Sequence, residues 1–130
     1  MVTRTVKYAL SVLRVLAESP GERVLGRDIA RVAGIPPHYV SKILSRLQKA
    51  GFVESQKGWG GGFVLTKWGA RRPLADVWRL FDARWDEGAC VFGLKRCNAS
   101  RPCPLHSRWA GIRGAFEQML ADTPVAQLGG

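Results

Sequence analysis

Residues 35–67, IPPHYVSKILSRLQKAGFVESQKGWGGGFVLTK, give the strongest indication of the fold. Apolar residues recur at helical spacing over residues 38–50, and Pro37 suits the first turn of that helix, where no amide bond is lost. A shorter helix is predicted over residues 27–33, with Gly34 as its C-terminal stop. Two helices joined by a tight turn that contains glycine are typical of a helix-turn-helix.

Two short apolar runs follow this pair of helices and flank a glycine-rich tip, KGWGGG, at residues 57–62. The runs begin at Phe52 and end at Leu65. Apolar runs on either side of a glycine-rich tip predict a β-hairpin. A hairpin placed directly after a helix-turn-helix is a wing, so we expect a winged helix-turn-helix.

Three further helices are predicted over residues 3–18, 73–85 and 107–121, because apolar residues recur at spacings of three and four in each. Thr3 or Thr5 can cap the first of them. The expected fold class is therefore mostly α with a small β-hairpin wing: a winged helix-turn-helix followed by a long C-terminal helix.

The last predicted helix carries large apolar residues and two glycines. Its apolar residues are expected on one face, with Met119 beside them: Trp109, Ile112, Phe116 and Leu120. Gly111 and Gly114 weaken the helix in isolation but would let another helix come close. The tail beyond this helix is expected to pack through Val125 and Leu128.

The net charge of +10 is concentrated in the first half of the chain. Residues 1–72 hold 13 Lys and Arg against 4 Asp and Glu, a net +9, whereas residues 73–130 hold 7 against 6, a net +1. The basic half indicates a polyanionic partner, and double-stranded DNA is the first candidate. A membrane surface is disfavoured because the basic residues lie across several elements rather than on one amphipathic helix.

Several other classes of protein are also disfavoured. No apolar run approaches the length needed to cross a bilayer. Lys7 and Arg14 interrupt the apolar residues at the N-terminus, so no signal peptide is predicted and a cytoplasmic location is expected. The sequence has no C-x-x-C motif, and the glycine tip lacks the ending of a phosphate-binding loop. We therefore do not expect an enzyme.

The outward polar residues of the second helix are the candidates for DNA contact, because the start of a recognition helix meets base edges. Lys42 is the candidate for reading guanine, and Arg46 and Lys49 are placed for phosphates. At the wing, Lys57 could reach a phosphate or the minor groove. The full candidate set is His38, Ser41, Lys42, Ser45, Arg46, Lys49, Lys57, Gly58, Trp59 and Gly60. Each cation taken singly could equally be a solvated surface charge.

All three cysteines, Cys90, Cys97 and Cys103, lie in one loop, and His106 follows them. In a reducing cytosol, clustered cysteines indicate metal binding or redox chemistry rather than a disulfide. Thiolates and imidazole ligate both zinc and iron–sulfur clusters, and gaps of six and five residues are wider than the usual zinc knuckle. A multi-iron cluster is favoured, while zinc and a metal-free thiol switch stay open. The alternative for His106 is a residue that merely begins a helix.

These motifs together resemble the IscR/NsrR family of bacterial transcriptional regulators (the Rrf-two family). The wing signature, a basic residue and G-x-G-G-G before an aromatic, stands here at residues 57–63, and the likeness runs over about residues 2–128. The resemblance implies a homodimer joined through residues 107–121 that binds palindromic promoter sites with two winged helices. It also implies a cluster that reports iron–sulfur supply, nitric oxide, oxygen or iron. Ser41 and Lys42 replace the family's usual acidic or Gln pair, so the operator sequence does not carry over.

The resemblance further implies that Cys90, Cys97 and Cys103 are thiolate ligands. IscR-like members add a histidine three residues after the last cysteine and hold a [2Fe–2S] cluster, and His106 fits that position. NsrR-like members hold a [4Fe–4S] cluster with an acid from the partner's first helix, where this chain has Val6-Lys7-Tyr8. A [2Fe–2S] cluster is favoured. A [4Fe–4S] cluster stays open because six residues, not five, separate the first two cysteines.

The expected function is a DNA-binding transcriptional regulator whose affinity for promoter DNA is controlled by a cysteine-ligated iron–sulfur cluster. Residues 1–72 are expected to form the winged helix-turn-helix DNA-binding domain. Residues 73–130 are expected to hold the cluster-binding loop and the dimerisation helix. The alternative is a winged-helix DNA-binding protein that is stabilised by zinc or switched by thiol oxidation.

Overall fold

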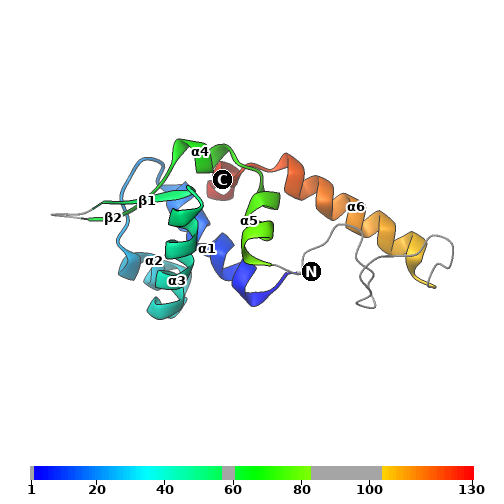
Figure 1. Ribbon diagram of the computed structural model, residues 1–130, viewed down its shortest axis with the longest axis horizontal. Helices are drawn as coiled ribbons and strands as arrows, with labels where there is room; N and C mark the ends of the chain where they lie inside the picture. The colour runs from blue at the N-terminus through cyan, green and yellow to red at the C-terminus, as the bar shows by residue number, and fades with distance from the viewer. Residues whose placement is uncertain (1, 57–60, 83–103) are drawn as a thin grey trace.

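The computed structural model of the chain describes residues 2–56, 61–82 and 104–130, which are mostly helical (Figure 1). The helices and strands are α1 (Arg4–Glu18), α2 (Gly26–Ala33), α3 (Pro37–Lys49), β1 (Val53–Gln56), β2 (Gly62–Leu65), α4 (Lys67–Arg71), α5 (Leu74–Phe81), α6 (His106–Asp122) and a closing 3-10 turn, η1 (Val125–Gly129). The predicted fold class is confirmed, since the helices carry a single antiparallel hairpin in the described ranges.

Helix α1 lies at the centre of the apolar core. Its buried side chains recur at helical spacing: Val6, Ala9, Val12, Leu13, Leu16 and Ala17. The Thr3 hydroxyl accepts a hydrogen bond from the Val6 amide at 3.1 Å, which confirms the predicted cap. Helices α2, α3 and α5 and the turn η1 all pack on α1, so the C-terminal Val125 shares a core with the N-terminal helix.

The helix-turn-helix has the predicted geometry. Gly34 ends α2 in the left-handed conformation, with φ 70°, and Pro37 begins α3. The Ile35 amide bonds to the Ala30 carbonyl across the turn at 3.0 Å. The predicted apolar residues of α3 are all buried: Val40, Ile43, Leu44 and Leu47. Helix α3 is thereby packed on the core along one side, and its other side faces solvent.

The predicted wing is present as the antiparallel pair β1 and β2, with Val53 opposite Leu65. Its tip, residues 57–60, lies outside the described residues. The sequence did not predict that Val24, in the segment before α2, pairs with Phe63 of β2. This bridge ties the base of the hairpin to the helix-turn-helix.

A short helix that the sequence did not predict, α4, links the wing to α5. Thr66 caps it by accepting the Gly69 amide at 2.8 Å. Gly69 lies so close to Phe52 that a β-carbon there would meet the Phe52 carbonyl oxygen at 2.5 Å. Helix α5 ends at Phe81, whereas we expected residues 73–85. Residues 83–85, the last part of the expected helix, lie outside the described residues.

Helix α6 runs away from the body formed by the other helices (Figure 1). Near its C-terminal end, Leu120 is buried and Phe116 packs edge-on against Trp78, with ring centroids 5.6 Å apart. Of the residues predicted to share one apolar face of the helix, Ile112 is 56% exposed. Arg113 is buried instead and bonds Glu117 at 2.6 Å. The expected packing of the tail is confirmed by η1.

No helix in the described ranges combines the length and the apolar character that a bilayer-crossing segment needs.

Candidate nucleic-acid interface

The exposed side of α3 carries five of the predicted DNA-contacting residues. They recur at spacings of three and four, which places them on one side of the helix. They are His38, Ser41, Lys42, Ser45 and Lys49, and all are exposed. The His38 ring packs against Tyr39, with ring centroids 4.4 Å apart. We call these five residues the α3 face.

Helix α3 is joined to the wing by a side-chain hydrogen bond. The Gln48 amide nitrogen donates to the Ser55 hydroxyl at 2.9 Å, and the Phe52 amide donates to the Leu47 carbonyl at 2.9 Å. These bonds set the angle between the recognition helix and β1. A ligand that bound both elements would therefore meet them in a fixed relative position.

Arg46 lies on α3 but has a different environment from the α3 face. Its Nη2 donates to the Leu80 carbonyl at 2.5 Å, and its Cζ lies 4.9 Å from the ring centroid of Phe81. The sequence placed this guanidinium for phosphate contact. In the structure the guanidinium is turned toward the last turn of α5.

A pocket of about 240 Å³ lies beside Arg46, between the start of α1, helix α3 and the end of α5. It is lined by Arg4, Thr5, Tyr8, Tyr39, Lys42, Ile43, Arg46 and Phe81. The Tyr8 and Tyr39 rings are tilted against each other with centroids 5.5 Å apart, and the Arg4 guanidinium lies 5.9 Å from the centroid of the Tyr39 ring. Of the described residues that line the pocket, three are cations and none is an acid, which favours a positive potential inside it.

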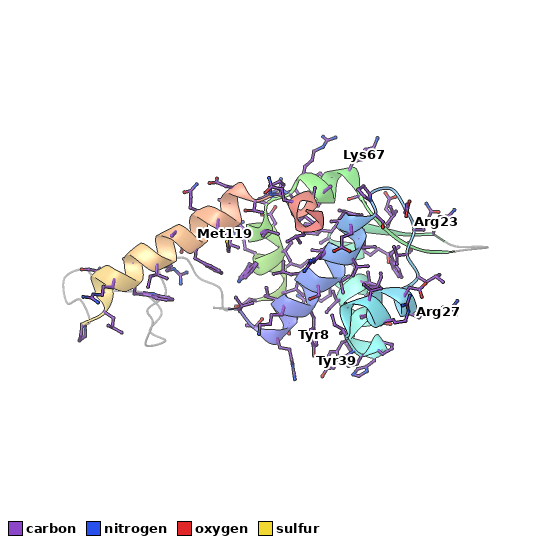
Figure 2. The ribbon with its side chains drawn as sticks, turned by 180° about the vertical axis from the view of Figure 1, so that it is seen from behind. Tyr8, Arg23, Arg27, Tyr39, Lys67 and Met119 are labelled. Atoms are coloured by element: carbon purple, nitrogen blue, oxygen red, sulfur yellow. The ribbon has the colours of Figure 1, made fainter. Side chains whose placement is uncertain are left out.

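Two cations near the wing were not among the candidates from the sequence. Arg23 precedes Val24, the residue paired with the wing, and Arg27 lies in the first turn of α2. Both are exposed, and Figure 2 shows them on the side of the molecule from which the hairpin projects. Only the pairing of Val24 with Phe63, which no local sequence pattern encodes, brings Arg23 to the wing.

The basic residues divide into those with an acidic neighbour and those without. Arg14 pairs with Glu18 at 3.2 Å, and Arg31 pairs with Asp28 at 3.6 Å. Arg72 pairs with Asp76. Within residues 2–56, 61–82 and 104–130, no carboxylate lies within ion-pair distance of the cations of the α3 face, nor of Arg23 or Arg27. Among the described residues, the cations around α3 and the base of the wing therefore have no ion-pair partner.

The four predicted wing-tip residues and the three cysteines cannot be placed. Lys57, Gly58, Trp59 and Gly60 lie outside the described residues, and so do Cys90, Cys97 and Cys103. The described residues contain no group of three potential metal ligands.

His106 is the one predicted metal ligand in the described part of the chain. It is half-buried and forms the first residue of α6. Its Nδ1 is buried and has no hydrogen-bond partner among the described residues. Buried polar atoms in proteins normally have a hydrogen-bond partner. The lone Nδ1 of His106 therefore fits a residue whose ring binds a metal or cluster.

The fixed wing, the exposed α3 face and the uncompensated positive charge define a winged-helix DNA-binding protein. The profile of the Rrf2 family, described as iron-dependent transcriptional regulators, matches residues 2–129. The chain belongs to the Rrf2 family. It is a DNA-binding transcriptional regulator and not an enzyme.

Similar sequences come from several bacteria. An HTH-type transcriptional regulator of Aquifex aeolicus (strain VF5) is 31% identical over 95% of this chain and 88% of its own length. The HTH-type transcriptional repressor NsrR of Streptomyces coelicolor is 31% identical over 80% of this chain and 67% of its own. The regulator IscR of Yersinia pestis is 29% identical over 98% of this chain and 77% of its own length.

Solved structures have the same fold at lower identity. CymR, the global cysteine regulator of B. subtilis, superimposes with a TM-score of 0.80 at 22% identity, covering 99% of this chain and 95% of that one. IscR of T. potens gives a TM-score of 0.72 at 22% identity, covering 98% and 85%. The winged-helix fold is common to all three chains.

Proposed function

We propose that this regulator controls its affinity for palindromic promoter DNA through an iron–sulfur cluster held by Cys90, Cys97, Cys103 and His106. The observation that carries the proposal is the buried, partnerless Nδ1 of His106. Cys103, the last of the three cysteines, lies three residues before His106. The cysteines do not form a C-x-x-C motif of the kind found in thiol oxidoreductases. The family's description as iron-dependent regulators supports the same chemistry.

If His106 is a cluster ligand, its buried Nδ1 gains the partner that it otherwise lacks among the described residues. Leaving a buried ring nitrogen unpaired costs about 1–3 kcal/mol, a cost that ligation or a hydrogen bond removes. The donor set of three thiolates and one imidazole suits iron–sulfur chemistry. Once bound, the cluster would supply a redox-sensitive and iron-sensitive link between residues 83–103 and the start of α6.

The first turn of α1 supports the histidine over an acidic ligand. That turn contains no acidic residue. Val6 is buried, Lys7 is exposed and Tyr8 lines the pocket near α3. None of these side chains is an acid that could ligate iron as the acidic residue of NsrR-like members does, so we favour a [2Fe–2S] cluster over a [4Fe–4S] cluster.

The α3 face is the proposed reader of the operator. Lys42 is proposed to contact a base edge in the major groove, and the neighbouring Ser41 and Ser45 can bond bases or phosphates. Lys49 and the wing tip at residues 57–60 are proposed phosphate or minor-groove contacts. To these we add Arg23 and Arg27, whose charges are uncompensated.

A homodimer would join two copies of α6 and present two recognition helices to a palindromic site. Three apolar residues recur every seven positions along α6 and are exposed: Leu105 just before it at 44%, Ile112 at 56% and Met119 at 48%. Gly111 and Gly114 lie beside open space. A spacing of seven makes one apolar stripe, which suits packing against a second helix. In this proposal residues 1–72 bind DNA and residues 73–130 hold the cluster and the dimer contact, in the cytoplasm.

The decisive experiment is anaerobic purification of the wild type and of His106→Ala, with iron, acid-labile sulfide and zinc measured per chain. We expect coloured wild-type protein with iron and sulfide in equal amounts, and the amount per chain separates [2Fe–2S] from [4Fe–4S]. His106→Ala should lose or destabilise the chromophore. Colourless wild-type protein that holds only zinc, or DNA affinity that responds only to thiol oxidation, would support the alternatives instead.

A further inference from the structure

Arg46 connects the recognition helix to the end of α5 by two contacts from one guanidinium. Nη2 donates to the Leu80 carbonyl at 2.5 Å while the planar group lies over the Phe81 ring at 4.9 Å. We infer that Arg46 is a positioning residue through which the end of α5 sets the orientation of α3, and that it is not a phosphate contact.

The position of Arg46 in the fold allows this contact to affect the orientation of α3. Beside it, the start of α1, helix α3 and the end of α5 surround an open pocket of about 240 Å³. The Arg46 contact therefore bridges α3 and α5 beside a space that side chains do not fill. Helix α3 is close-packed on the core through its buried side. On the pocket side no such packing resists displacement, so a shift of the Arg46 anchor would change the orientation of the helix there.

Helix α5 ends at Phe81, and the segment that contains all three cysteines follows almost directly. Leu80 and Phe81, the two residues that Arg46 contacts, lie at the end of α5 where that segment begins, so they are the described residues through which a change there would reach α3 in this inference. This part of the inference rests on the proposed function. If cysteine ligation constrains the segment, Arg46 is the route by which the constraint reaches the DNA-reading helix.

Arginine is the residue type that this role requires. Its planar guanidinium can donate in its plane to a carbonyl while an aromatic ring covers its face, and the compact ammonium of lysine cannot do both. Arg46→Lys thus keeps the charge near DNA and removes the bridge. Lys49 lies one turn further along α3, is exposed and has no ion pair among the described residues, so it offers a matched control.

The first test uses cluster-free protein and measures promoter affinity against salt concentration. A lost phosphate contact lowers the slope of log affinity against log salt by about 0.9. We expect this reduction for Lys49→Gln. Arg46→Gln should keep the wild-type slope and weaken binding by about threefold to tenfold, the loss of one hydrogen bond. A slope that falls equally in both variants would show that Arg46 contacts phosphate, and would overturn the inference.

The second test compares the promoter affinities of cluster-loaded and cluster-free protein. We expect Arg46→Lys to bring their ratio close to one with iron and sulfide content unchanged, and Lys49→Arg to keep the wild-type ratio. Phe81→Leu should act like Arg46→Lys, and the double variant should add little. A wild-type ratio retained in Arg46→Lys would refute the coupling. A wild type without a cluster would refute the proposed function instead, and the salt slopes would still decide the role of Arg46.

Discussion

Val24 and Phe63 form a reciprocal backbone pair, in which each amide donates to the other's carbonyl at 2.9 Å. The pair adds the segment before α2 to the edge of the hairpin. On the other strand, Gln48 of α3 bonds Ser55 of β1. The base of the wing is thus fixed to the helix-turn-helix from both strands, and the DNA-contacting elements form one unit.

This arrangement makes Gly62 structurally necessary. Its φ is 126°, and a β-carbon there would meet the Val24 carbonyl oxygen at 2.8 Å. Gly62→Ala should lower the free energy of unfolding by roughly 2–4 kcal/mol, because strain and a backbone clash add. Gly34→Ala is the control, since Gly34 also has a positive φ, 70°, but nothing lies within 4 Å. It should cost about 1–2 kcal/mol. Equal urea midpoints for the two variants would contradict the clash.

The cations near the wing should contribute to DNA affinity through phosphate contacts. Arg23→Ala and Arg27→Ala are each expected to lower the salt slope of promoter binding by about 0.9 and to weaken specific and non-specific DNA alike. Arg14→Ala removes the same charge from an arginine paired with Glu18 on α1, and should leave the slope unchanged. Fluorescence anisotropy over a salt series measures all three. Identical slopes for Arg14 and Arg23 variants would argue against a contact at Arg23.

Lys42 should affect the choice of sequence rather than general affinity. Loss of a base contact costs about 1–3 kcal/mol of discrimination. Lys42→Ala is therefore expected to weaken binding to the promoter more than binding to random DNA, and to leave the visible spectrum of the anaerobic protein unchanged. Undiminished promoter binding at matched salt would mean that the α3 face is not the recognition surface.

The thiolates should be required for colour but not for assembly. Cys97→Ala is expected to abolish visible absorbance in anaerobically purified protein, because a proposed ligand is lost. Sedimentation should still give a dimer, since the proposed α6 contact does not involve Cys97. A spectrum identical to that of the wild type would remove Cys97 from the ligand set.

The exposed stripe of α6 should control the oligomeric state. Ile112→Asp places a charge in the proposed dimer contact and is expected to yield a folded monomer, because burying an unpaired carboxylate is costly. Val32→Asp is a matched control, since Val32 of α2 is equally exposed, at 57%, but lies away from α6. Analytical ultracentrifugation of both variants measures the effect. A dimeric Ile112→Asp protein would place the interface elsewhere.

Features that depend on neighbours along the chain were predicted correctly from the sequence. The cap at Thr3, the stop at Gly34 and the start of α3 at Pro37 all follow from residue chemistry within one or two turns. The exposed α3 face was also predicted, because helical periodicity separates Lys42 from the buried Ile43. The cysteine motif was visible for the same reason, since its residues lie close together in the chain.

Features that depend on distant contacts could not be predicted from local patterns. Ile112 shares an apolar helix face with the buried Leu120, yet it is 56% exposed, because α6 extends away from the body formed by the other helices. Arg46 has the same local pattern as Lys49, yet only Arg46 lies within reach of Leu80. No local pattern predicts the pairing of Val24 with Phe63.

Local chemistry and periodicity along the chain were enough to predict the hairpin and every described helix of eight residues or more, although not the short α4. The basic half of the chain and the group of three cysteines are likewise visible in the sequence. Only the folded chain shows which cations have an acidic neighbour and that the exposed Arg46 contacts the end of α5. It also shows that the Nδ1 of His106 is buried without a hydrogen-bond partner among the described residues. The physical reason is that burial and pairing depend on groups brought together by folding. The same side chain can be a solvated charge or a structural contact, and its place in the packed fold decides between them.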